Sequence, residues 1–303
     1  MAALARSTLW RDLVVIHRLE FPFPVSYLAQ ASWGACLAAT VSPHQLLDVS
    51  VLLAVLANLV LVTAGLALNV AVDVRTDARH QDKHYLASAV TRLGRDRVFR
   101  WVALETVVGL ALATVVSVWT GHWLVAGSAV VIVGLHLLYN IEPVRLKRRG
   151  FAGVAVFGLS VVTMPCLLSY GAIRPTVDAP VWLIAAGLGV MAVGRTVWWS
   201  VPDRAADTAT GMVTPAVRHG AGRALAAACL LMAAGLVLLG WGLWWRYGLA
   251  WALLGTAMYG VFLGNALTLF RREVPSAVRL RTRALPLIMV GDVLVALIAL
   301  TAG

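Results

Sequence analysis

Long apolar runs dominate this sequence and decide what the chain can fold into. A helix needs about 20 mostly apolar residues to cross the hydrocarbon core of a bilayer. Apolar residues make up 60% of the 303 residues and charged residues only 13%, whereas about 25% are charged in an average soluble domain. These values exclude soluble, disordered and collagen-like proteins. Nine runs are long enough to span a membrane: residues 23–41, 46–72, 98–119, 123–139, 151–170, 181–201, 224–245, 249–270 and 285–301.

The connections between these runs alternate between two kinds. The short connections are nearly neutral and contain only two basic residues, Arg174 and Arg246. Nearly every other Lys or Arg lies in the N-terminal segment or in long connections, at residues 73–97, 141–150, 202–223 and 271–283. This is the positive-inside pattern of membrane proteins. It predicts that the N-terminus and the long connections face the cytoplasm, and nine crossings then put the C-terminus outside.

The net charge of +11 follows from this topology. Basic connections face anionic lipid at the cytoplasmic leaflet, so the charge does not call for a nucleic-acid partner. The three cysteines, Cys36, Cys166 and Cys229, each lie inside an apolar run, which excludes a disulfide framework and a zinc site. No shift in composition marks a second domain. We therefore expect an all-α integral membrane protein, with residues 1–303 in one bundle of nine transmembrane helices.

Two aspartate pairs recur at the predicted cytoplasmic ends of spans. The second span ends in NVAVDVRTD, where Asn69, Asp73 and Asp77 follow one another at intervals of four. On an α-helix this interval puts side chains on one face. The sixth span runs into VPDRAAD, where Asp203 and Asp207 repeat the interval. Both pairs are therefore expected at the same membrane face, around an active-site cavity on the cytoplasmic side.

Carboxylate pairs without His or Cys favour hard cations, and Mg²⁺ in particular. Proteins typically hold Mg²⁺ with one or two carboxylates together with phosphate oxygens of a substrate. The two pairs therefore predict a site for Mg²⁺ and a diphosphate, to which nearby basic residues donate charge-assisted hydrogen bonds. The competing interpretation is that these aspartates are only polar residues at helix ends. The repetition of the motif on one side argues against it.

A third segment on the same side, YNIEPVRLKRRG, begins at Tyr139. With it, the chain resembles the UbiA superfamily of intramembrane prenyltransferases. Those proteins have nine transmembrane helices, with an N-x-x-x-D-x-x-x-D motif after the second and a D-x-x-x-D motif after the sixth. The chain is most similar to the branch of homogentisate prenyltransferases, chlorophyll synthases and lycopene elongases. That branch has a Tyr-Ser-x-Pro-Pro-x-Arg/Lys-Leu-Lys segment, and Glu142 here replaces its first proline. In KHYLASAVTRLG, Lys83 aligns with a family lysine, but the two prolines of the family are missing.

The resemblance implies Mg²⁺-dependent transfer of an isoprenyl group from an allylic prenyl diphosphate to a lipophilic, aromatic acceptor, with release of diphosphate. It implies that Tyr139 faces the allylic cation or orients the acceptor. It further implies four Mg²⁺ ligands, Asp73, Asp77, Asp203 and Asp207, and four residues that bind diphosphate, Asn69, Lys83, Arg145 and Lys147.

The sequence leaves other functions open. A UbiA-type terpene cyclase would use the same ionisation but capture the cation within the same molecule. Release of diphosphate without an added acceptor would distinguish it. A transporter or channel is disfavoured because the acids lie at one membrane face rather than near the midplane. Ionisable residues inside spans are functional candidates by default. Of these, Arg195 is a candidate to face the cavity, whereas Glu105 and Asp292 are expected to pair across helices.

Overall fold

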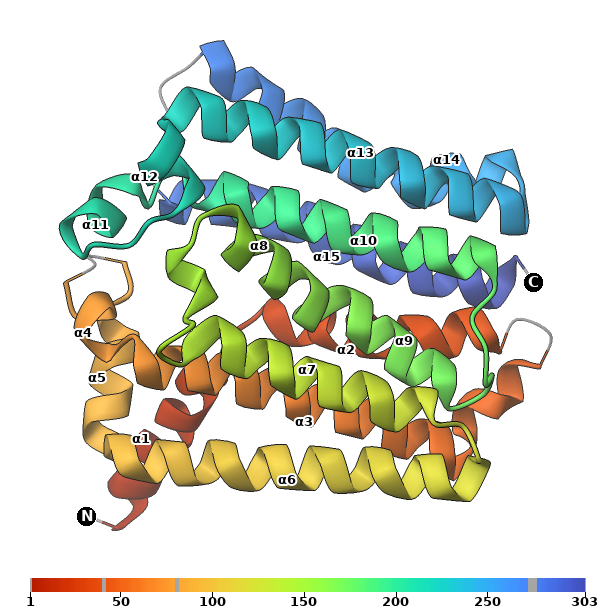
Figure 1. Ribbon diagram of the computed structural model, residues 1–303, viewed down its shortest axis with the longest axis horizontal. Coiled ribbons are helices and arrows are strands. Elements are labelled where there is room, and N and C mark those ends of the chain that lie inside the picture. Colours follow the sequence, from red (N-terminus) through yellow and green to blue (C-terminus); the bar gives the residue numbers. More distant parts are fainter. Residues whose placement is uncertain (1, 40–41, 80–81, 272–276, 303) are drawn as a thin grey trace.

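The computed structural model describes residues 2–39, 42–79, 82–271 and 277–302, and this part of the chain is helical with no β-strand (Figure 1). Seven helical segments are long and apolar enough to cross a membrane. They are α3 (Val49–Val72), α6 (Arg95–Thr120), the continuous helix Phe151–Gly171 formed by α8 and α9, α10 (Ala179–Trp199), α13 (Ala221–Tyr247), α14 (Leu249–Thr268), and Thr282–Thr301 of α15 (Ala277–Thr301).

The other two expected spans coincide with shorter helices. These are α2 (Phe23–Ala38), of 16 residues, and α7 (Leu124–Asn140), of 17 residues. The multi-pass helical architecture is therefore confirmed, whereas the count of nine crossings stays a prediction. Residues 272–276, within the expected basic connection 271–283, lie outside the described residues.

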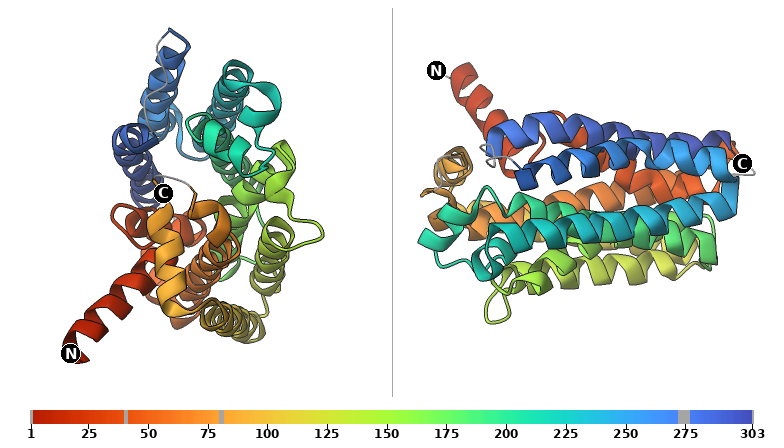
Figure 2. Two further views of the ribbon diagram at one scale, coloured as in Figure 1. Left: turned by 90° about the vertical axis from the view of Figure 1, so that its left-hand side faces the viewer. Right: turned by 90° about the horizontal axis from the view of Figure 1, so that it is seen from above.

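The long helices pack side by side in a closed ring (Figure 2). Going round it, α3 contacts α7, α7 contacts α8 and α9, α8 contacts α10, and α13, α14, α15 and α2 lead back to α3. Helix α6 packs outside the ring against α3. Since lipid tails are as apolar as the helices, close van der Waals packing rather than the hydrophobic effect holds such a ring together.

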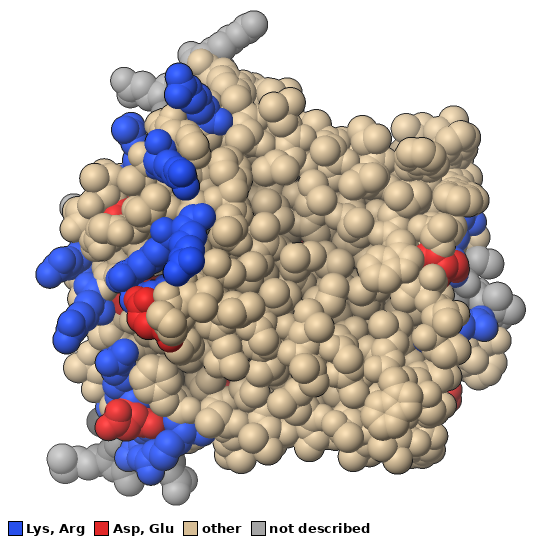
Figure 3. All heavy atoms as spheres, viewed as in Figure 1, with Lys and Arg blue, Asp and Glu red and all other residues tan. Residues whose placement is uncertain are grey.

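Short helices and turns gather at one end of the ring. They are α4 (Val74–Asp77), α5 (His84–Leu93), α11 (Arg204–Ala209) and α12 (Pro215–His219), and α1 (Ala2–Ile16) packs on α5 there (Figure 1). The Arg92 guanidinium of α5 holds the Asp12 carboxylate of α1 at 2.6 Å. Figure 3 shows the Lys and Arg side chains of this face concentrated at the same end. The two ends of the chain lie at opposite ends of the bundle (Figure 1).

Helices α10 and α13 approach so closely that glycine is required between them. A Cβ atom added at Gly235 would lie 2.6 Å from the backbone nitrogen of Met191 and 2.7 Å from the carbonyl oxygen of Gly187. Glycine at such positions lets two membrane helices touch along their backbones. The contact fixes α10, which leads into the second aspartate motif, against α13.

The substitution Gly235→Ala tests this contact. The added methyl group has no room, and overpacking of this kind costs about 1–3 kcal/mol. We expect a lower melting temperature for the purified protein in detergent. The matched control is Gly264→Ala in α14, where an added Cβ meets nothing within 4 Å, so this variant should be as stable as the parent or slightly more. Equal melting temperatures for both variants would contradict the close approach.

Candidate active site

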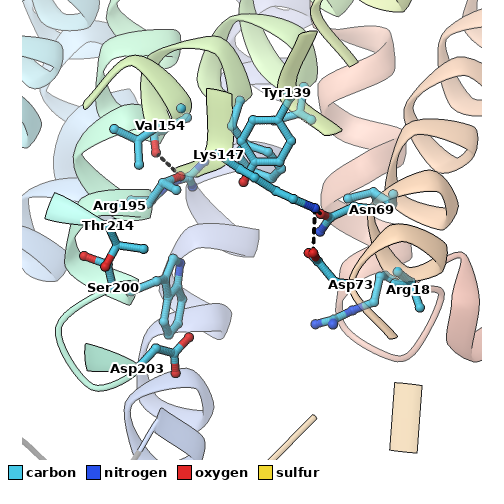
Figure 4. Close-up of a pocket in the computed structure, with 18 of the residues that line it drawn as sticks. Arg18, Asn69, Asp73, Tyr139, Lys147, Val154, Arg195, Ser200, Asp203 and Thr214 are labelled. Atoms are coloured by element: carbon cyan, nitrogen blue, oxygen red, sulfur yellow. Dashed lines mark hydrogen bonds and ion pairs between the residues drawn. The ribbon is translucent and has the colours of Figure 1, made fainter. Parts of the chain in front are cut away.

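A cavity of about 390 Å³ lies inside the ring, at the end that carries the short helices. Side chains from α2, α3, α7, α8, α10 and α15 line it, and both aspartate motifs are among them (Figure 4). Part of its wall is apolar, formed by Val62, Leu66, Phe157, Val161, Val162 and Ile288. Val161 and Val162 belong to a π-helical turn, Leu159–Thr163, which interrupts the helix Phe151–Gly171. Such wide turns inside α-helices are frequent at functional sites.

The first aspartate motif lies where α3 ends. The helix stops at Val72, and Asp73 has non-helical backbone angles. The helix therefore ends at the predicted end of the second span. The hydrogen-bond pattern nonetheless continues, because Asp73 N–H donates to Asn69 O and Asp77 N–H donates to Asp73 O, at 3.0 and 2.8 Å. Asn69, Asp73 and Asp77 consequently all line the cavity.

The second motif follows the end of α10. Proline has no N–H to donate, so Pro202 cannot continue the helix, and the chain turns before α11 begins at Arg204. Asp203 precedes α11, and Asp207 N–H donates to Asp203 O at 2.9 Å. Both carboxylates line the cavity and are more than 90% buried, as is Asp77.

The segment from Tyr139 to Lys147 meets the first motif. Lys147 Nζ lies 2.7 Å from Asp73 Oδ1, and it also donates to Asn69 Oδ1 at 3.1 Å. Its third acceptor is Asn140 Oδ1, at 3.3 Å. Arg145 adds a second cation, with Nη2 3.2 Å from the same Asp73 oxygen. Two basic side chains thus converge on one carboxylate, which is only 12% exposed.

Two further contacts involve the remaining predicted residues. Lys83, before α5, places its Nζ 2.8 Å from Asp203 Oδ2 and so reaches the second motif from the other side of the cavity mouth. The Tyr139 ring lines the cavity, with its centroid 6.0 Å from Lys147 Nζ. Of the predicted site residues, only Arg145 is absent from the cavity wall. It touches the site through Asp73.

Burial makes two of the carboxylates, Asp77 and Asp207, harder to ionise. Burial and the neighbouring Asp73 charge raise the pKa of Asp77 to about 7. Burial, with Asp203 nearby, raises the pKa of Asp207 to about 6, although Lys83 opposes the shift. Burial lowers the pKa of Lys147, against the attraction of Asp73. A cation held between such carboxylates would favour their charged forms.

The donor set fits Mg²⁺ together with a phosphate ligand, rather than a closed metal cage. Among the described residues, no group of three or more His, Cys, Asp or Glu side chains is placed to hold a metal ion. Figure 4 shows Asp73 and Asp203 on opposite sides of the pocket. The carboxylates lie in pairs across a space that basic groups also line. This arrangement suits Mg²⁺, which completes its coordination shell with phosphate oxygens and water.

Several residues of the site region were not among the predicted site residues, and Arg18, Thr214 and Asn140 are three of them. Arg18 and Thr214 line the cavity, and Asn140 orients Lys147 from a position that is 1% exposed. Asn140 directly follows Tyr139 in the sequence, and this adjacency was the only signal that pointed to it. Neither Arg18 nor Thr214 had a distinguishing pattern, because single polar residues at the ends of spans are common.

Comparison with known proteins identifies the family. The sequence matches the UbiA prenyltransferase family over residues 27–287. The chain belongs to this family. No curated protein matches the chain by sequence.

Several solved structures share the fold of this UbiA prenyltransferase. A UbiA homologue from Archaeoglobus fulgidus bound to DMAPP and Mg²⁺ is 13% identical, with a TM-score of 0.68 over 94% of this chain and 99% of that one. A UbiA homologue from Aeropyrum pernix K1, solved without ligand, is 16% identical, with a TM-score of 0.70 over 90% and 95%. A digeranylgeranylglyceryl phosphate synthase is 15% identical, with a TM-score of 0.68 over 96% and 98%.

The convergence on Asp73 predicts which basic residue matters for prenyltransferase activity. Lys147→Met removes the buried ammonium, and because hydrogen bonds to charged groups are strong, kcat/KM should fall at least about tenfold. Arg148→Met is the control, since the Arg148 side chain is 40% exposed and its Nη1 lies 3.6 Å from Glu142 Oε1. That variant should keep activity within about twofold of the parent, as expected for an exposed ion pair. Equal losses in the two variants would contradict the assignment.

Proposed function

We propose that this protein transfers an isoprenyl group from an allylic prenyl diphosphate to a lipophilic, aromatic acceptor and releases diphosphate, in a reaction that depends on Mg²⁺. One observation carries the proposal. Both aspartate motifs, Lys83 and Lys147 line a single cavity that also has an apolar wall. A prenyl diphosphate has a charged head and an apolar tail, and the cavity offers surroundings for both. The UbiA homologue bound to DMAPP and Mg²⁺, which shares this fold, supports the same donor class.

The chain's own residues suit the departure of diphosphate. In the proposed step the carbon–oxygen bond of the donor breaks, and its electron pair leaves with the diphosphate. Lys147 and Lys83 are hydrogen-bond donors in contact with the aspartates, Asn69 accepts a hydrogen bond from Lys147, and Arg145 adds a fixed positive charge. Donors aimed at the leaving group stabilise the charge that builds up there. Mg²⁺, held by Asp73, Asp77, Asp203 and Asp207, would neutralise further charge on the phosphate oxygens.

The allylic cation then has to be kept from water until the acceptor captures it. The apolar wall of the cavity excludes water, and the Tyr139 ring can stabilise a positive charge with its π face. An electron-rich carbon of the acceptor supplies the electron pair of the new carbon–carbon bond, and that carbon then loses a proton. Transfer to a second molecule distinguishes this reaction from that of a terpene cyclase, in which the cation is captured within the same molecule.

The test is an assay of diphosphate release by membranes that contain the protein. The substrates are allylic diphosphates of different chain length, each with and without Mg²⁺ and with and without an extract of lipids and quinone precursors. We expect release that needs both Mg²⁺ and extract. Asp73→Ala and Asp203→Ala should abolish it, whereas Asp96→Ala, at an exposed position near the start of α6, should keep it. Mg²⁺-dependent release without extract would instead identify a cyclase, and full activity in Asp73→Ala would overturn the site.

We further propose nine crossings, with the cavity mouth and the N-terminus in the cytoplasm and the C-terminus outside the cell membrane. The concentration of Lys and Arg at the cavity end supports this orientation (Figure 3). The three native cysteines are buried. In intact cells, a thiol reagent that cannot cross membranes should therefore label this protein only at an added cysteine on the outer face. Thr301→Cys should be labelled in intact cells and Arg97→Cys only after permeabilisation. The reverse pattern would contradict the topology.

A further inference from the structure

Helix α5 lies at the cavity end of the bundle, where it contacts α1, α4 and the ends of α3 and α6 (Figure 1). Its apolar face packs into a small buried cluster that is separate from the other two clusters of the bundle. The members from α5 are Leu86, Ala89, Val90 and Leu93. The remaining members come from α1, α3 and α6. Helix α1 thus supplies part of the surface that holds α5.

An ion pair reinforces the packing of α1 on α5. Asp12 is 4% exposed, and Arg92 donates to both of its carboxylate oxygens, from Nε at 2.9 Å and from Nη2 at 2.6 Å. Two parallel bonds of this kind fix the orientation of the two groups as well as their distance. Ile16 of α1 is fully buried in the same cluster, and His17 Nε2 lies 2.9 Å from Glu105 Oε1 of α6. Helix α1 is therefore anchored to α5 and α6 together.

The position of α5 decides where Lys83 can reach. Lys83 directly precedes α5, lines the cavity, and places its Nζ 2.8 Å from Asp203 Oδ2, in the turn after α10. A lysine side chain has a flexible stem, so the place of its ammonium depends on where its backbone is held. Arg92 lies near the other end of α5, about 13 Å away along the helix axis. The ion pair with Asp12 therefore fixes one end of a short helix whose other end carries Lys83 to the site.

We propose that Asp12 is a positioning residue for the prenyl diphosphate: it holds Arg92, and through α5 it keeps Lys83 at the mouth of the cavity. The proposal rests on the proposed function, in which Lys83 donates to the diphosphate. Loss of the ion pair loosens α5 and weakens binding of the donor, while Lys147 and the aspartates keep their places. Because this loss affects bound substrate and transition state alike, KM for the donor should rise more than kcat falls.

Equilibrium binding tests whether Asp12 acts through Lys83. The probe is a prenyl thiodiphosphate with Mg²⁺, titrated against the purified protein in detergent. Lys83→Met should raise Kd about tenfold, as expected for one lost hydrogen bond to a charged group, and Asp12→Ala should raise it at least about threefold. The double variant Asp12→Ala/Lys83→Met should bind within about twofold of Lys83→Met alone, because the two residues act in series. Asp12→Glu keeps a carboxylate and should recover part of the affinity.

The matched control is Asp178→Asn. Asp178 forms an ion pair of 2.7 Å with Arg246, and it caps the start of α10, at the opposite end of that helix from the second aspartate motif. The substitution therefore breaks an Arg–Asp contact between helices away from the cavity. It should leave Kd for the probe within about twofold of the parent, as expected for a partly exposed pair that does not touch the site.

Distances between spin labels test whether α5 itself is held by Asp12. Thr91→Cys in α5 and Thr208→Cys in α11 are suitable sites, since both threonines are exposed and each hydroxyl bonds to a carbonyl of its own helix. The three native cysteines are buried. Asp12→Ala should broaden the distribution of distances between the two labels, whereas Asp178→Asn should leave it as in the parent.

Either of two results would overturn the proposal. One is an unchanged distribution of label distances in Asp12→Ala. The other is a double variant whose loss of affinity equals the product of the two single losses, because Asp12 would then act independently of Lys83. Failure of the parent protein to bind the prenyl thiodiphosphate would instead defeat the proposed donor, and the label distances would still decide whether Asp12 holds α5.

Discussion

Charged side chains in an apolar helical bundle are costly unless they are paired, and this constraint organises the mouth of the cavity. Removing a charge from water without a partner is costly, and breaking a buried pair leaves that cost exposed. Here Asp73 pairs with Lys147 at 2.7 Å and Asp203 pairs with Lys83 at 2.8 Å. These two pairs join the end of α3, the connection before α8, the start of α5 and the turn after α10. The contacts that neutralise buried aspartates therefore also build the mouth of the cavity.

The same ion pairs suggest how the basic side chains could exchange an aspartate for a phosphate when substrate binds. Without substrate, Lys147 contacts Asp73 and Lys83 contacts Asp203. The pKa values of Asp77 and Asp207 are raised because burial disfavours their charged forms. Lys147 and Lys83 both line the cavity, where a phosphate oxygen could accept their hydrogen bonds instead. The ring of helices supplies the apolar wall that a prenyl tail requires. That wall is held in place by contacts such as the one between Gly235 and Gly187.

Sequence reasoning reached the elements that follow from hydropathy and charge. Apolar runs gave the helices, and the alternation of basic connections put both aspartate motifs at one end. The end of α3 at Val72 agrees with the predicted end of the second span, and an interval of four residues also fits the turn that the chain makes after it. The contact of Lys83 with Asp203 spans 120 residues of sequence, and no local pattern encodes it. The bonds from Gln30 and Tyr259 to Asp292 depend on how three helices, α2, α14 and α15, pack together, which a single sequence does not specify.

The most direct test of this account is an experimental structure of the protein with Mg²⁺ and a prenyl thiodiphosphate, which resists cleavage. The account predicts that the diphosphate lies between Asp73 and Asp203, with metal ions on the carboxylates. It also predicts Lys147 within hydrogen-bond distance of a phosphate oxygen and the tail along the wall that includes Val161 and Phe157. A diphosphate bound elsewhere, with Asp73 still paired only to Lys147 and Arg145, would contradict the account.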